Sequence, residues 1–219
     1  MDTLVQVIPT TDIDTAAAAI EAGRRVVVPT ARWYMICADA ANPDAYRAIL
    51  EGKQRPKNKP LALVVPDQDR ARDLLHFTPD AERLADAFWP GDLALFLSWR
   101  DPADAARYTV VGSPALTTHA PGPLGALARA VPGLLAATTV NVSGDAGPDD
   151  RGPAIALDEV EEFLTCAGLD AVVMDGGVCP AANHLTIVDC ADDQTHLVRA
   201  GLVHQRAVAS ALGRVLPTS

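Results

Sequence analysis

All three lysines of this 219-residue chain lie within one short segment, Lys53-Gln54-Arg55-Pro56-Lys57-Asn58-Lys59. The chain carries 18 basic and 28 acidic residues, so its formal charge is −10. Lysine supplies a mobile point charge and arginine a planar fork of donors, which is the combination that phosphate or carboxylate recognition uses. We therefore interpret Lys53, Arg55 and Lys59 as part of an anion-binding site. The alternative is a solvated loop with scattered charges.

Further polar side chains directly follow two apolar runs that we interpret as strands. They are Thr30, Arg32 and Tyr34 after residues 25–28, and Thr139, Asn141 and Ser143 after residues 134–138. The carboxyl ends of strands are where open α/β sheets bind ligands, so we expect these groups to contact an anionic substrate. Alternatively, Thr30 only caps a turn, Tyr34 packs in the core, and the second group forms an Asx or Ser/Thr turn.

His119 and the cysteines are the remaining candidates for chemistry. His119 lies in a short polar loop, and an imidazole with its ordinary pKa of about 6.5 could act as a general acid or base. A surface or hydrogen-bonded structural histidine is the alternative. The four cysteines form no CxxC pair, so we expect buried structural thiols and no tightly bound metal; they are Cys37, Cys166, Cys179 and Cys190.

Short apolar runs alternate with helical patterns along the chain, which predicts a mixed α/β fold in a single domain, residues 1–219. Strands are expected at residues 4–8, 25–28, 61–65, 93–98, 134–138, 171–174 and 185–188. Helices are expected at residues 12–22, 43–50, 80–88, 124–130, 157–164 and 204–215, with Gly23 ending the first. The Gly- and Asp-rich stretch 142–153 is expected to be an exposed, mobile loop.

Composition excludes several classes of function. A charge of −10 argues against a general nucleic-acid-binding face and against attraction to anionic membranes. The first twenty residues lack the pattern of a secretory signal, and no apolar run reaches the roughly 18 residues of a membrane span. We therefore expect a cytoplasmic protein with no membrane partner.

Several ordered motifs resemble the YrdC/Sua5 (TsaC) family of threonylcarbamoyl-AMP synthases, from about Ile13 to Val203. The matching segments are Ala16–Thr30 ("VVxPT"), Lys53–Leu61 ("KxRPxxKPL"), Phe88–Ala94 ("FWPGPLT"), Thr138–Gly144 ("TSANxSG"), Asp175–Gly177 ("DGG") and Leu185–Asp189 ("STVVD"). The resemblance implies a YrdC-like α/β domain, with a twisted mixed sheet and flanking helices around a large cationic cleft.

The resemblance also implies a reaction and its reactants. Family enzymes join threonine, bicarbonate and ATP to give threonylcarbamoyl-AMP and pyrophosphate, for the modification of tRNA. Their KxR and SxN tetrad falls on Lys53, Arg55, Thr139 and Asn141. ATP with Mg²⁺ is the implied cofactor set, and cations near the α-phosphorus would stabilise the charge that builds there. A protein partner could complete the site, and nucleic acid is expected at most at the cleft rim, although relatives have been associated with double-stranded RNA.

The chain departs from the family pattern in three places, which predicts an altered substrate pocket. Ala31, Arg32 and Met35 replace an acid, a Thr and a Gly after the first strand motif; Val111–Leu116 lacks the Arg and His of "VRxPxH"; and Leu185 replaces a Ser. Arg32 could restore the charge that Gly112 lacks.

Two other functions remain open from these residues. One is a repurposed enzyme of secondary metabolism that acts on another anionic small molecule, by carbamoyl transfer or by elimination or ring closure that expels sulfate or phosphate. The other is a non-catalytic module that binds nucleotide, RNA or a protein partner.

Overall fold

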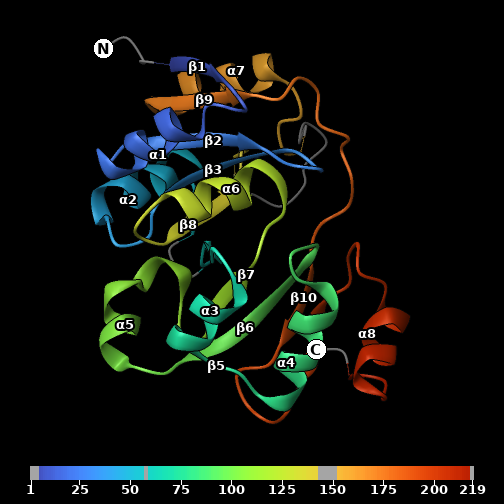
Figure 1. Cartoon of the computed structure of the whole chain (residues 1–219). Helices are drawn as coiled ribbons and strands as arrows, with labels where there is room; N and C mark the ends of the chain where they lie inside the picture. Colours follow the sequence, from blue (N-terminus) through green and yellow to red (C-terminus); the bar gives the residue numbers. More distant parts are fainter. Residues whose placement is uncertain (1–4, 57–58, 143–151, 218–219) are drawn as a thin grey trace. The chain divides into compact units, whose positions relative to one another are not determined.

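The computed structural model describes residues 5–56, 59–142 and 152–217. Contacts between Cα atoms divide the chain into two compact units, Met1–Lys59 with Gly122–Ala182, and Pro60–Pro121 with Asn183–Ser219. Each unit combines a mixed sheet with helices (Figure 1). This confirms the mixed α/β class, whereas the single domain over residues 1–219 stays a prediction.

The sheet of the first unit has the strand order β1-β9-β2-β3-β8. The central pairs are parallel between β9 and β2 and antiparallel from β2 through β3 to β8. Their bounds are β1 Val5–Pro9, β2 Arg25–Pro29, β3 Tyr34–Asp39, β8 Leu135–Thr139 and β9 Ala171–Asp175. The side chains of Val26, Val27 and Val28 are fully buried, as a β-branched run in a strand covered on both faces should be.

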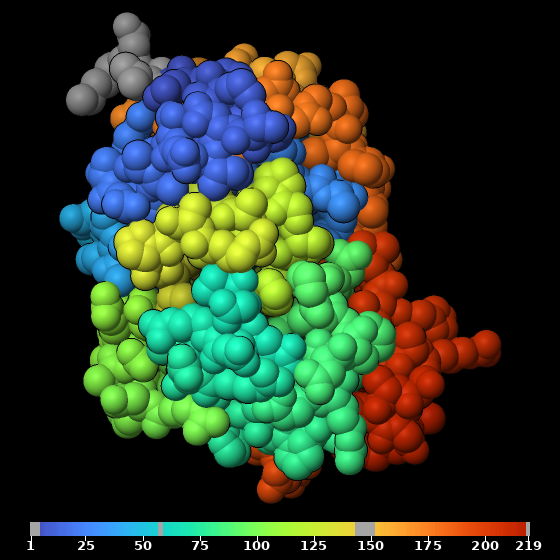
Figure 2. All heavy atoms as spheres, in the orientation of Figure 1, coloured from blue at the N-terminus to red at the C-terminus, as the bar shows by residue number. Residues whose placement is uncertain are grey.

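Among its described residues, the first unit has the helices α1 Ile13–Glu21, α2 Pro43–Gly52, α6 Gly122–Ala130 and α7 Leu157–Ala167. Helix α2 begins where the Asn42 side chain accepts the backbone N–H groups of Asp44 and Ala45, both at 3.1 Å, and Pro43 occupies the first turn. Helix α2 ends at Gly52, and Lys53 is its C-cap residue, so the end of the helix fixes where the Lys53 side chain begins. Helices α1 and α6 pack together, and Figure 2 shows their atoms side by side (blue and yellow).

The sheet of the second unit has the order β4-β7-β6-β10-β11, with β5 paired to β6. Strands β6 and β7 are antiparallel, whereas β4 runs parallel to β7 and β10 parallel to β6. The bounds are β4 Ala62–Val64, β5 Leu75–His76, β6 Leu93–Trp99, β7 Ala115–Thr118, β10 Thr186–Asp189 and β11 His196–Arg199.

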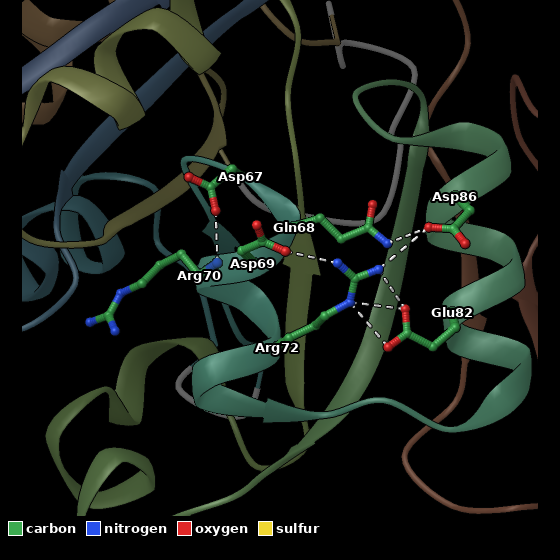
Figure 3. A network of polar contacts seen from close by, with 7 residues as sticks. All are labelled: Asp67, Gln68, Asp69, Arg70, Arg72, Glu82 and Asp86. Carbon is green, nitrogen blue, oxygen red and sulfur yellow. Dashed lines mark hydrogen bonds and ion pairs between the residues drawn. The ribbon is translucent and has the colours of Figure 1, made fainter.

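The helices of the second unit are α3 Gln68–Leu74, α4 Pro79–Phe88, α5 Pro102–Arg107, the 3₁₀ turn η1 Thr109–Val111, and α8 Gln205–Leu212. Arg72 joins α3 to α4 (Figure 3): its guanidinium donates to both carboxylate oxygens of Glu82, at 2.8 to 3.1 Å, and to Asp69 at 2.9 Å. The guanidinium of Arg70 points away from this network in the same view.

Every predicted strand and helix has a counterpart, but seven elements of the described residues were not predicted: β3, β5, β7, β11, α3, α5 and η1. The sequence did not predict strand β3, because Tyr34 and Met35 belong to a stretch that resembles a family motif and were not assigned to a buried apolar run. Helix α8 ends at Leu212, not at residue 215, because Gly213 takes a left-handed φ of 71°. Residues 143–151 of the predicted loop 142–153 lie outside the described residues.

The cysteine prediction is confirmed for Cys37, Cys179 and Cys190, whose side chains are buried, and is wrong for Cys166, which is exposed on α7. Across the parts of the chain that the structure describes, we find no helix with both the length and the apolar character of a membrane span.

Candidate functional site

Lys53 lies at the end of α2 and reaches the end of β8 with a completely buried side chain. Its Nζ donates to the backbone oxygens of Thr139 and Asn141, both at 2.5 Å, and to Asn141 Oδ1 at 3.0 Å. The Phe163 ring of α7 lies 5.8 Å from the same nitrogen, within cation–π range. We call Lys53, Thr139 and Asn141 the β8-end cluster.

Within the β8-end cluster, the Thr139 hydroxyl donates to Asn141 Oδ1 at 2.6 Å. The Asn141 amide nitrogen donates onward to the backbone oxygen of Val142 at 2.9 Å. The structure therefore brings together three of the four residues that the motif resemblance grouped, on two segments 86 residues apart in the chain.

The electrostatics of the cluster are set by burial. Burial, and to a smaller extent the positive charge of Arg55, together lower the pKa of Lys53 to about 7. The three acceptor oxygens favour the ammonium form, so they act against that shift. Arg55 is half-buried and donates from Nε to the Lys59 oxygen at 3.1 Å; burial lowers the pKa of its guanidinium too. Two cations thus lie near each other at this end of the unit.

The turn after β2 uses the Thr30 hydroxyl internally. This hydroxyl donates to the Trp33 oxygen at 2.7 Å and accepts the backbone N–H groups of Arg32 and Trp33, at 3.2 and 3.3 Å. Thr30 therefore caps this turn, and its contact with a ligand stays a prediction. Arg32 and Trp33 are both buried, and the Arg32 guanidinium lies 5.8 Å from the Trp33 ring centre. Contact of Arg32 with an anion stays a prediction.

Tyr34 connects β3 to the loop after β9. Its hydroxyl donates to the Gly177 oxygen at 2.8 Å and accepts the Gly176 N–H at 3.1 Å. The side chain is fully buried, and burial raises the pKa of the phenol despite the hydrogen bond from Gly176. Gly176 itself leaves no room for a side chain, because a Cβ there would lie 2.5 Å from Pro29 Cβ. Tyr34 thus holds the "DGG" loop, and its contact with a ligand stays a prediction.

The other predicted site residues are placed as follows. Lys59 is exposed, while Ser143 and Lys57 lie outside the described residues. His119 belongs to the second unit, where its backbone oxygen accepts the Gly91 N–H at 3.1 Å; its role stays a prediction. Among the described residues, no group of three or more His, Cys, Asp or Glu side chains could hold a metal ion.

The segment that lacks the family arginine has a backbone suited to glycine. Gly112 takes φ 85° and ψ 175°, and the Trp99 indole donates to its oxygen at 2.9 Å. A Cβ at this position would lie 3.1 Å from the Pro114 oxygen and 3.2 Å from Pro60 Cβ. An arginine at this position would therefore need a backbone conformation that residues with a Cβ rarely adopt.

Sequence reasoning missed Phe163 as a neighbour of the cluster. Phe163 occupies an apolar position of the predicted helix 157–164, and apolar spacing alone indicates only that it faces inward. No local signal could have paired it with Lys53, because the contact joins segments 110 residues apart.

Comparisons with known proteins agree with this architecture. The family model Sua5_yciO_yrdC, described as telomere recombination, matches residues 18–201. Threonylcarbamoyl-AMP synthase of Bacillus subtilis is 31% identical over 203 residues, which cover 91% of this chain and 56% of the relative. Putative threonylcarbamoyl-AMP synthase of Mycobacterium leprae is 33% identical over 215 residues, which cover 94% of this chain and 90% of the relative.

Among solved structures, Sua5 of Pyrococcus abyssi complexed with L-threonine superposes with a TM-score of 0.80 at 22% identity, covering 100% of this chain and 63% of that chain. This likeness confirms the predicted fold class, while the large cationic cleft stays a prediction. The chain spans a little over half the length of the Bacillus and Pyrococcus proteins.

Proposed function

Because the chain belongs to the Sua5/YciO/YrdC family, we propose that it is a threonylcarbamoyl-AMP synthase of the tRNA-modification pathway. The reaction joins threonine, bicarbonate and ATP and releases pyrophosphate. The observation that carries the proposal is the β8-end cluster, in which Lys53, Thr139 and Asn141 meet at one strand end with Arg55 nearby. The similarities favour neither alternative function.

Arg55 is the cation that we assign to the nucleotide. When a carbamate oxygen attacks the α-phosphorus, negative charge builds on the phosphoryl oxygens and an anionic leaving group departs. A half-buried guanidinium opposes this charge more strongly than an exposed one, because water screens it less. Its planar donors also match two phosphate oxygens at once.

Mg²⁺ carried by ATP would neutralise phosphate charge. The described residues supply no carboxylate cluster for a protein-held ion, so we assign no step to such a metal. The catalysis that we propose is positional and electrostatic, and it needs no protein nucleophile.

The test is pyrophosphate release by the purified chain with ATP, bicarbonate and threonine, with each reactant omitted in turn. We expect release that requires all three. Release that is absent, or equal without threonine, would contradict the proposal.

Two variants locate the activity. Arg55→Met should lower kcat/KM by roughly 10- to 100-fold, the value of a charge-assisted contact. Arg47→Met removes one charge at an exposed position of α2, outside the proposed site, and should change kcat/KM by less than about threefold. Equal losses in both variants would mean that Arg55 has no specific role.

A further inference from the structure

Each of the three N–H bonds of the Lys53 ammonium has an acceptor in the protein. An ammonium carries three N–H bonds and cannot accept, and three oxygens within 3.0 Å, two from Asn141 and one from Thr139, take them. The side chain has no exposed surface. We propose that Lys53 is a positioning residue, whose ammonium orients the Thr139–Asn141 hydrogen bonds so that the Thr139 hydroxyl accepts from the substrate.

The first step of the argument is backbone geometry. The carbonyl oxygens of Thr139 and Asn141 both approach one nitrogen, although they are only two residues apart. Two carbonyl dipoles with their negative ends together repel each other unless a cation lies between them. The ammonium therefore stabilises the curled path of the chain just after β8, at the end of the strand where we place the substrate.

The second step follows hydrogen-bond polarity. Because the ammonium form of Lys53 can only donate, it requires the Asn141 side chain to turn its oxygen toward Nζ, and this fixes which way the amide points. The amide nitrogen then faces the Val142 oxygen, which is also an acceptor, so both contacts agree on one orientation. Lys53 thus sets the orientation of the Asn141 side-chain amide.

The third step concerns Thr139. Asn141 Oδ1 can only accept, so the Thr139 hydroxyl donates its single hydrogen to this oxygen, at 2.6 Å. A hydroxyl has one donor and two lone pairs, and here the lone pairs are what it can offer a ligand. The polar group that Thr139 recognises is therefore an N–H or O–H of the substrate, not a phosphate oxygen. Within the proposed function, on which this point rests, that group belongs to the amino-acid-derived part of the substrate.

The decisive experiment compares amide hydrogen exchange of the ligand-free chain in two variants. The Val140 N–H, which is bonded to the Tyr34 oxygen at 3.0 Å, reports on the strand end between Thr139 and Asn141. Lys53→Met should speed its exchange by at least about tenfold while exchange elsewhere in β3 stays within about twofold. Arg55→Met loses the same charge from the same segment and should leave Val140 within about twofold of the unmodified chain. Equal Val140 exchange in Lys53→Met and the unmodified chain would overturn the proposal.

A second measurement needs no variant that might misfold. The chain has three lysines, so ¹⁵N-lysine labelling gives three side-chain ammonium signals. At about pH 6, the Lys53 ammonium should exchange its hydrogens with water far more slowly than the exposed Lys59 ammonium. Substitutions Lys57→Arg and Lys59→Arg assign the other two signals. Exchange of Lys53 as fast as that of Lys59 would overturn the proposal.

Both measurements use the ligand-free chain, so their outcome does not depend on whether pyrophosphate release is found. The substrate contact of Thr139 is tested separately. Thr139→Val should raise the KM for threonine while leaving the KM for ATP unchanged, and Thr139→Ser should restore it. A rise in the KM for ATP alone would overturn the assignment of the hydroxyl.

Discussion

Restoring the family arginine at position 112 should destabilise the second unit rather than repair a site. Gly112 takes φ 85° and ψ 175°, a region that residues with a Cβ rarely adopt and that costs about 1–3 kcal/mol to enforce. Added Cβ contacts of 3.1 and 3.2 Å, with the Pro114 oxygen and Pro60 Cβ, require those neighbours to shift. Together these effects should lower the free energy of unfolding by about 2–4 kcal/mol.

Urea unfolding followed by tryptophan fluorescence measures this change, because the Trp99 indole is hydrogen-bonded to the Gly112 oxygen. With a dependence of about 2 kcal/mol per molar urea, a loss of 2 kcal/mol lowers the midpoint by about 1 M. Gly112→Ala should lose about as much as Gly112→Arg, because the backbone causes most of the cost. Ser113→Arg places the same side chain at the exposed neighbouring position and should shift the midpoint by less than about 0.3 M.

The reasoning is refuted if Gly112→Arg unfolds at the same urea concentration as the unmodified chain. A gain in affinity for ATP or pyrophosphate in that variant would further show that the segment tolerates the family arginine. Either result would mean that the backbone at Gly112 is adaptable and that the departure from the family motif affects the side chain alone.

Three more predictions concern named hydrogen bonds and charges. Tyr34→Phe removes the hydroxyl that bridges Gly176 and Gly177 and should cost about 1–2 kcal/mol in urea unfolding, whereas an unchanged midpoint would show that water replaces it. Arg72→Met should lower the free energy of unfolding by about 1 kcal/mol at low salt and by less at about 1 M NaCl (Figure 3). Arg70→Met removes an equal charge and serves as the control. A loss of stability that does not depend on salt would contradict an electrostatic origin. Burial lowers the pKa of Lys53 to about 7, below its ordinary 10.5, so the unfolded chain binds more protons between these values. Relative to Lys53→Met, the folded chain should therefore gain up to about 1.4 kcal/mol per pH unit as the pH rises from about 7 toward 10.5. Below about pH 7 this gain is absent and the hydrogen bonds of the ammonium are what Lys53 contributes; parallel pH profiles of the two proteins would contradict this.

Local patterns predicted much of the fold. The buried strands β2, β8 and β9 and the helices α1, α2 and α7 follow from apolar periodicity and from caps such as Asn42, because those forces act within a few residues. Helix α3 was missed although Asp67 accepts the Arg70 N–H at 2.7 Å and so caps it, which shows that a single capping residue is a weak signal without clear apolar spacing.

By itself, the sequence determined that Lys53 and Arg55 lie in a basic segment of an otherwise acidic chain. It also grouped them with Thr139 and Asn141, through the resemblance to the family's KxR and SxN tetrad. Only the tertiary structure decided what Lys53 does, since a lysine in a basic segment can extend into solvent or be buried, and the choice depends on the acceptors that β8 brings to it. Likewise, the sequence did not indicate the protein partners of the Thr30 and Tyr34 hydroxyls, which are the Trp33 oxygen and the Gly176–Gly177 loop. The physical reason is that hydrogen-bond partners of buried polar groups come from segments distant in the chain, and their convergence depends on how the whole unit packs.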